Sequence, residues 1–129
     1  MKFVIDTNII FSALYNPHSK AGEIILFAIE GKIELYAPES VKSELTKILE
    51  KKLDYEKEEI EETITSLPIT WIEKEIYEEY KEEFDLRDDN DRSVAACCLI
   101  LNCALLTGDK DFDNVKKIKV MSLRNVGLE

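Results

Sequence analysis

Four acidic residues stand at positions from which their carboxylate groups could share one chemical task. They are Asp6, Glu44, Asp91 and Asp109. Carboxylate oxygens without histidine or cysteine ligands favour a hard divalent cation such as Mg²⁺ or Mn²⁺. Such an ion can bridge a phosphate group, activate a water molecule and stabilise the leaving oxygen. This set of residues therefore predicts metal-dependent hydrolysis of a phosphodiester bond.

Asp6 and Asp109 each follow a short apolar run that is typical of a buried strand. Asp6 directly follows residues 3–5, and Asp109 follows residues 104–107 after one glycine. In an open parallel sheet, ligands bind beyond the carboxyl ends of the strands. Either aspartate alone could be a turn residue or a helix N-cap. Two at equivalent positions indicate one site on adjacent strands, and we expect the strand at 33–36 on the other side of the first.

Glu44 and Asp91 are expected on helices. Glu44 lies three residues after Val41 and four before Ile48, so it shares their apolar stripe. A carboxylate turned toward a core is costly unless it is paired or binds a metal, although a glutamate at the helix edge could instead reach water. Asp91 begins a helix and faces the same way as Val94, while any of residues 88–90 could act as the N-cap. Asp91 is then free for another role, with capping as its alternative.

Bringing four carboxylates together requires a compensating charge. Two unit charges ~4 Å apart interact by about 4 kcal/mol at an effective dielectric constant near 20. Arg87, Arg92 and Lys110 are near these acids in sequence and could offset only part of that repulsion. A bound cation is therefore expected.

The remaining sequence predicts the elements that position these residues. Apolar, β-prone runs alternate with segments of helical periodicity, a pattern that indicates a mostly parallel sheet covered on both faces. We expect one α/β domain over residues 1–129. Its predicted strands are 3–5, 33–36, 104–107, 118–120 and a weaker one at 69–72, and its predicted helices include 21–29, 41–49, 60–67, 76–84 and 94–101.

Composition limits the partners. The net charge of −10 argues against broad, salt-steered binding of nucleic acid but leaves room for a short substrate held through metal ions. No run approaches the roughly 18 apolar residues of a membrane helix, and no signal peptide is recognised, so we expect a cytoplasmic protein without a membrane partner. The three cysteines, Cys97, Cys98 and Cys103, are a poor disulfide framework and are expected to be small buried residues.

At these residues the chain resembles the PIN-domain family, in particular single-domain prokaryotic toxins of the VapC-like kind. The segments that carry the resemblance follow in order over nearly the whole chain. They are DTNIIFSAL at 6–14, VKSEL at 41–45, DDND at 88–91 leading into VAA at 94–96, and LTGDKDF at 106–112.

The resemblance implies a three-layer fold with a five-stranded parallel sheet of order 3-2-1-4-5 and a Mg²⁺- or Mn²⁺-dependent endoribonuclease site. Asp6, Glu44, Asp91 and Asp109 match the acidic positions of the family, and Asn8, Ser12 and Thr107 match polar positions that support the site. Asp111 is a further acid, which we expect rather to cap the turn before Phe112. The resemblance also implies an RNA substrate, a homodimer and, for toxin members, a small antitoxin protein.

Other functions fit less well. A receiver domain would need an acidic pair after the first strand, where this chain has Asp6-Thr7-Asn8, and a phosphoacceptor aspartate after the third. A phosphatase of the haloacid-dehalogenase type would need a second aspartate in place of Asn8. A third alternative is a PIN fold kept as an antitoxin-binding or regulatory module with little turnover, which the acidic charge favours and the intact carboxylates oppose.

One further pattern concerns assembly. Tyr77, Tyr80 and Phe84 form an aromatic stripe in an acidic predicted helix. Ordinary core packing is the preferred interpretation, and an exposed stripe that contributes to a homodimer is the alternative.

Overall fold

The computed structural model describes residues 1–126 and contains a five-stranded parallel sheet. The strands lie in the order β3-β2-β1-β4-β5, which confirms the predicted topology. Their bounds are β1 Lys2–Ile5, β2 Glu34–Pro38, β3 Ile69–Ile72, β4 Ala104–Leu106 and β5 Val120–Met121. The last strand therefore lies slightly later than the predicted 118–120.

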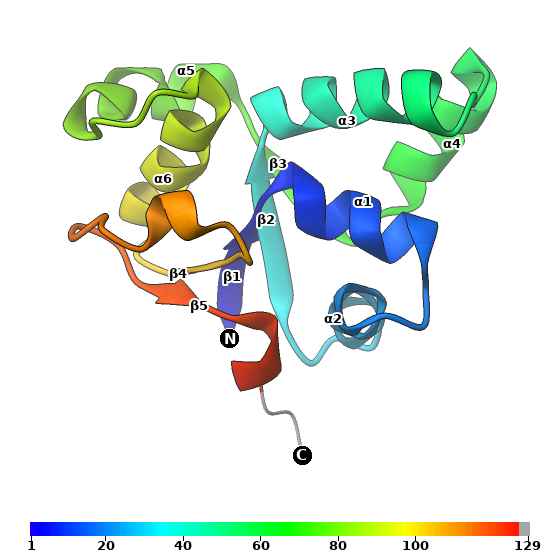
Figure 1. The fold of residues 1–129 in the computed structure, drawn as a ribbon, viewed down its shortest axis with the longest axis horizontal. Helices are drawn as coiled ribbons and strands as arrows, with labels where there is room; N and C mark the ends of the chain where they lie inside the picture. Colours follow the sequence, from blue (N-terminus) through cyan, green and yellow to red (C-terminus); the bar gives the residue numbers. More distant parts are fainter. Residues whose placement is uncertain (127–129) are drawn as a thin grey trace.

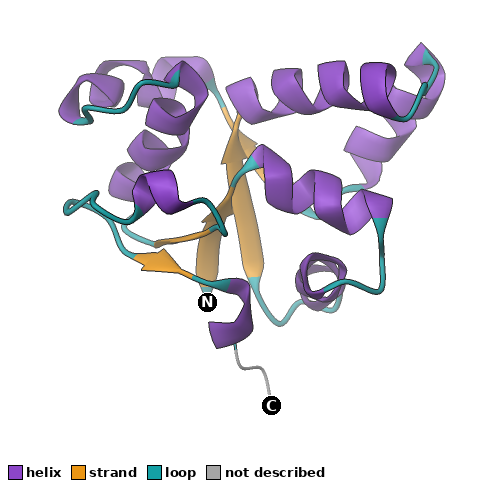
Figure 2. Ribbon diagram, viewed as in Figure 1, coloured by secondary structure: helices purple, strands orange, loops and turns teal. Residues whose placement is uncertain are grey.

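Helices cover both faces of the sheet. Figure 1 shows α1 and α2 on one side of the central strands and α5 and α6 on the other, while Figure 2 shows the strands enclosed between these layers. The α-helices are α1 Thr7–Tyr15, α2 Lys20–Ile29, α3 Glu39–Lys52, α4 Lys57–Ser66, α5 Lys74–Tyr77 and α6 Asp89–Leu101, and the 3₁₀ helices are η1 Glu78–Glu83, η2 Lys110–Phe112 and η3 Leu123–Asn125. Within residues 1–126, no helix has the length and apolar character needed to cross a bilayer.

The central strands explain why the carboxyl edge is well positioned. β1 pairs with β4 in the register Val4 with Leu105 and Ile5 with Leu106, and all four of these side chains are fully buried. Buried apolar residues on both faces of neighbouring strands are typical of parallel sheets. Because β1 and β4 end side by side, the residues that follow them, Asp6 and Thr107, are brought into contact.

Helix α1 was not predicted from the sequence. Asp6 caps it, since its Oδ1 accepts a hydrogen bond from the backbone N–H of Ile9 at 3.1 Å. Ile9, Ile10 and Ala13 are buried at helical spacing, so the apolar face of α1 packs onto the core. The first predicted acid therefore lies at the junction of β1 and α1.

The aromatic segment at 76–84 is not the single helix that was predicted. α5 ends at Tyr77, and the chain continues as the 3₁₀ helix η1. Tyr77 and Phe84 are buried, whereas Tyr80 is 40% exposed, and the Tyr77 hydroxyl accepts a hydrogen bond from the Ser40 N–H at 3.3 Å. Core packing, the preferred interpretation, is thus correct for two of the three aromatic residues.

Candidate metal centre

Asp6 is the most buried acid of the predicted site, with 6% of its surface exposed. Besides the capping bond at Oδ1, its Oδ2 accepts a hydrogen bond of 2.5 Å from the Thr107 hydroxyl. Burial raises the pKa of this carboxyl group, and the charges of Asp109 and Glu44 raise it further, while the two hydrogen bonds oppose the shift. A buried carboxylate is thus held in one orientation beside other negative charges.

Thr107 joins Asp6 to Asp109. Its hydroxyl oxygen, which donates to Asp6, also accepts a hydrogen bond from the backbone N–H of Asp109 at 3.0 Å. Asp109 then caps η2, because its Oδ1 accepts from the Asp111 N–H at 2.9 Å. The ends of β1 and β4 and the turn that follows β4 are therefore linked by consecutive hydrogen bonds.

Asp91 lies in the first turn of α6 and does not cap that helix. Asp88 is the cap, since its Oδ1 accepts from the N–H groups of Asn90 and Asp91 at 2.8 and 3.1 Å. Burial, followed by the charges of Asp88, Asp109, Asp111 and Asp6, raises the Asp91 pKa to about 7. No side-chain hydrogen bond engages the Asp91 carboxylate within the described residues, so this group is free to bind a ligand.

Three carboxylates form the tightest group. Asp91, Asp109 and Asp111 each offer an oxygen, and these three oxygens lie within 4.8 Å of one another. Asp91 and Asp109 are half-buried and Asp111 is exposed. The expectation that Asp111 caps the turn before Phe112 was wrong: Asp109 is the cap, and the Asp111 carboxylate instead faces the other two acids.

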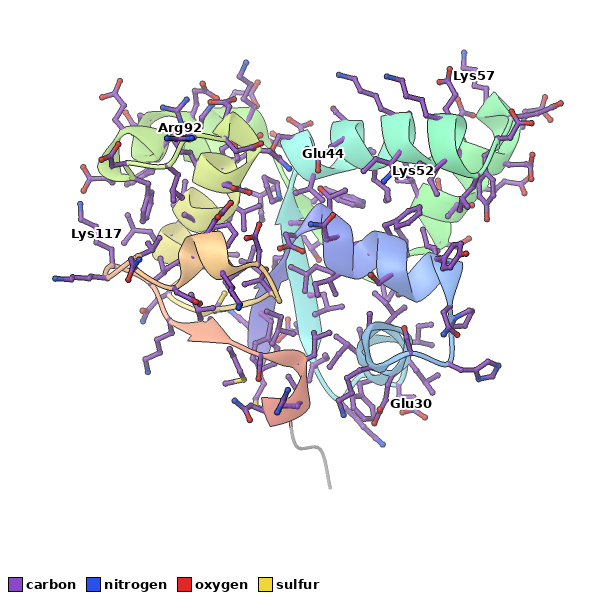
Figure 3. All side chains as sticks on the ribbon, viewed as in Figure 1. Glu30, Glu44, Lys52, Lys57, Arg92 and Lys117 are labelled. Atoms are coloured by element: carbon purple, nitrogen blue, oxygen red, sulfur yellow. The ribbon has the colours of Figure 1, made fainter. Side chains whose placement is uncertain are left out.

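Glu44 approaches the group from α3. It is half-buried, next to the fully buried Val41 and Leu45, as its place on the apolar stripe predicted. Its charge contributes to the raised pKa of Asp6, and Figure 3 shows it near the start of α3, beside the first turn of α1. Glu44 and Asp6 lie outside the tight group of three, so the five acids form an extended site, not one compact cluster.

The predicted supporting residues differ in their contacts. Thr107 is buried and bonds to two parts of the site, as described above. Asn8 and Ser12 are exposed on α1 and make no side-chain hydrogen bond within residues 1–126. Two residues that sequence reasoning did not select, Thr7 and Asn90, hydrogen-bond to each other beside Asp6 and Asp91. Their adjacency to predicted acids in sequence was the only signal that could have identified them.

Basic residues do not neutralise the group. Arg92 and Lys81 both pair with Asp89, at 2.7 and 2.9 Å. Arg87 and Lys110 form no ion pair in the described part of the chain. None of these four basic residues therefore forms an ion pair with an acid of the site, whose carboxylate oxygens suit a divalent cation.

Comparisons with known proteins concern the fold and the family of the chain. No curated protein matches the chain in sequence. Three solved structures share its fold. VapBC2 from Rickettsia felis, bound to a promoter DNA fragment, has a TM-score of 0.66 and 19% identity, and the match covers 95% of this chain and 98% of that one. A toxin–antitoxin complex from Klebsiella pneumoniae has a TM-score of 0.66 and 18% identity (94% and 97% covered), and VapBC-1 from nontypeable Haemophilus influenzae has a TM-score of 0.64 and 20% identity (97% and 100% covered).

Identities this low show likeness of fold alone. The family relationship comes from the sequence model of the PIN domain, which matches residues 3–118. That span includes every acid of the candidate centre and the strands β1 to β4, apart from Lys2 at the start of β1. The chain belongs to the PIN-domain family.

Proposed function

We propose that this protein is a divalent-metal-dependent endoribonuclease and the toxin of a toxin–antitoxin pair. The observation that carries the proposal is the group of carboxylate oxygens from Asp91, Asp109 and Asp111 within 4.8 Å of one another, beside Asp6 and Glu44, in a PIN-domain chain. Membership in this family supports nuclease activity. Hydrolysis of RNA with Mg²⁺ or Mn²⁺ is the specific reaction that we infer.

The residues present fit such an ion. All the candidate ligands are carboxylate oxygens, which suit Mg²⁺ or Mn²⁺ and not a soft metal. The raised pKa values of Asp6 and Asp91 reflect burial first and then the charges of neighbouring carboxylates, and a cation would offset both effects. We assign Asp6 and Asp91 as direct ligands, and Glu44 and Asp109 as ligands that bind directly or through water. Asp111 is an additional, exposed acid beside Asp91 and Asp109.

The ion would polarise the scissile phosphate and lower the pKa of the attacking water. The protein supplies orientation. The Ile9 N–H and the Thr107 hydroxyl hold both oxygens of Asp6, and the cap of η2 fixes one oxygen of Asp109. The Asp91 carboxylate accepts no hydrogen bond from a donor within residues 1–126, so it can turn to the ion. His18, the single histidine, lies outside this group, so no histidine base is assigned.

An antitoxin partner is supported by the solved structures of like fold, which come from VapBC or toxin–antitoxin complexes. By the same resemblance we propose a homodimer and action in the cytoplasm. Asn8 and Ser12 keep supporting roles at the exposed side of α1, where a substrate would approach, on the basis of the family resemblance alone.

The alternative is a binding or regulatory module of the same fold with little turnover, and the net charge of −10 favours it. Purified protein incubated with single-stranded and structured RNA in the presence of Mn²⁺ separates the two functions. We expect cleavage of at least one class of RNA. Binding of an antitoxin without cleavage of either class would favour the regulatory module.

A further inference from the structure

A hydrogen bond between two helices joins the neighbours in sequence of two acids of the candidate metal centre. The side-chain amide of Asn90, in the first turn of α6, donates through Nδ2 to the Thr7 hydroxyl, in the first turn of α1, at 3.3 Å. Asn90 precedes Asp91 and Thr7 follows Asp6. The bond therefore joins the two backbone segments that carry the acids assigned above as direct ligands.

Little else joins these helices. Within residues 1–126 this is the only hydrogen bond between α1 and α6, and the two helices do not pack closely against each other. α6 instead packs mainly on η1 and the sheet, whereas α1 packs on α2 and α3. Without the Asn90–Thr7 bond, the position of Asp91 relative to Asp6 would depend on contacts made farther along each helix.

The local chemistry indicates that Asn90 is not there for stability. Thr7 is 2% exposed, and Oδ1 of Asn90 is buried without a hydrogen-bond partner. An unpaired buried acceptor is destabilising, whereas replacing both members of a buried pair by apolar groups of the same shape can be nearly neutral. A pair of this kind at this place has a better explanation in the geometry of the site.

We propose that Asn90 and Thr7 are positioning residues that set the separation of Asp91 and Asp6 for one shared cation. This inference rests on the proposed function, because it assigns the pair a role in metal binding. Neither residue touches the ion or the substrate. Their effect passes through the backbone of the adjoining acids.

The decisive variant is the double replacement Thr7→Val with Asn90→Leu, which removes both polar side chains and so leaves neither of them buried without a hydrogen-bond partner. Outer residues that orient metal ligands typically change affinity by 10–100-fold when replaced, so we expect Mn²⁺ to bind roughly tenfold more weakly, measured by calorimetry. The melting temperature of the metal-free double variant should match that of the unaltered protein. Each single variant should lose about as much affinity as the double, because all three break the same bond.

Two controls separate positioning from general damage. Thr7→Ser keeps the hydroxyl and should retain Mn²⁺ affinity. Thr46→Val removes a hydroxyl on α3 that bonds only to the Lys42 carbonyl at 2.9 Å, and it should change nothing at the site. Unaltered Mn²⁺ affinity in the double variant would overturn the inference. So would a loss of affinity in the double variant that equals the product of the losses in the two single variants.

A readout without metal keeps the test independent of the proposed function. Amide hydrogen exchange at residues 89–92 in metal-free protein should be faster in Thr7→Val than in Thr7→Ser, because the valine variant lacks the hydrogen bond between the first turn of α6 and α1. Equal exchange rates would overturn the inference. If the unaltered protein binds no Mn²⁺, the proposed function fails, and the exchange rates still decide whether the pair fixes α6.

Discussion

The hydroxyl of Thr107 donates a hydrogen bond of 2.5 Å to Oδ2 of Asp6, although the two residues are 101 positions apart in the sequence. The same hydroxyl oxygen accepts from the Asp109 N–H at 3.0 Å. One side chain thus satisfies a buried carboxylate that directly follows β1 and a backbone donor after β4. Because the three groups depend on one another, the orientation of Asp6 is sensitive to a single atom of Thr107.

Replacing Thr107 by valine keeps the volume and removes that atom. Asp6 and the Asp109 N–H each lose a partner, and leaving a buried polar group unsatisfied costs about 1–3 kcal/mol, so the free energy of unfolding in urea should fall by about that amount. The pKa of Asp6 should rise further, because a bond that lowers it is gone. Thr107→Ser is the matched control and should be close to the unaltered protein. A valine variant with normal stability and normal Mn²⁺ affinity would show that the bond has no such role.

The pH dependence of stability follows from Asp91. Its pKa is raised from 3.8 to about 7, so between these values the folded protein holds a proton that the unfolded chain has lost. The free energy of unfolding of metal-free protein should therefore decrease as the pH rises from about 4 to about 7. The raised pKa of Asp6 acts in the same direction. Urea unfolding at pH 5 and pH 8 measures the difference, and it should be smaller in Asp91→Asn.

Metal affinity should have the opposite trend. A proton and a cation compete for Asp91, so Mn²⁺ should bind more tightly as the pH rises toward about 7 and then level off. Calorimetry in buffers with different heats of ionisation should detect proton release at pH 6 and less of it at pH 8. An Asp91→Asn variant with the same pH profile as the unaltered protein would assign the titration to another group.

Asp111 offers a test of the extended site. Its carboxylate lies within 4.8 Å of those of Asp91 and Asp109, whereas Asp113, two residues later, is exposed and outside that group. We expect Asp111→Asn to weaken Mn²⁺ binding severalfold and Asp113→Asn to leave it unchanged. The readout is metal-induced stabilisation, which reaches about 2.7 kcal/mol at a hundredfold excess of ion over Kd. Equal effects of the two replacements would mean that only overall charge matters.

The homodimer is a separate prediction, and it does not depend on the aromatic stripe, because Tyr77 and Phe84 are buried within the chain. It rests on the family resemblance. Light scattering at micromolar concentration and moderate salt should give twice the mass of the 14.9 kDa chain. A monomer under those conditions would remove the proposal without affecting the assignment of the metal centre.

The sequence predicted the sheet well because its strands are short apolar runs at regular spacing. It placed Asp6 and Asp109 after the ends of adjacent strands, and the structure pairs β1 with β4. It also placed Glu44 on the apolar stripe of α3, since periodicity determines which face a residue occupies. Helix α1 was missed even though Asp6 is a suitable N-cap and Ile9, Ile10 and Ala13 have helical spacing. Asp6 thus has both roles that the sequence offered for it, because it caps a helix and also lies among the acids of the candidate centre.

The remaining details depend on tertiary contacts that no local pattern contains. Asp111 lies near Asp91 in a turn after β4 that the Asp109 side chain caps, and Asn90 contacts Thr7 across 83 positions of sequence. The split of the predicted helix at 76–84 into α5 and η1 similarly accompanies the burial of Tyr77 beside Ser40. Periodicity gives the face of an element but not the partner that it meets.

The proposed function requires that Asp6 and Asp91 hold a divalent ion that is needed for RNA cleavage. The most direct measurement is cleavage of single-stranded and structured RNA by the unaltered protein, Asp6→Asn and Asp91→Asn, each in Mg²⁺ or Mn²⁺ with and without EDTA. Asparagine keeps the size of the side chain and can still cap α1, so metal-free thermal stability should stay level or rise. We expect EDTA to abolish cleavage and activity to fall steeply in both variants. Chelator-insensitive cleavage, or full activity in both variants, would contradict the proposed function.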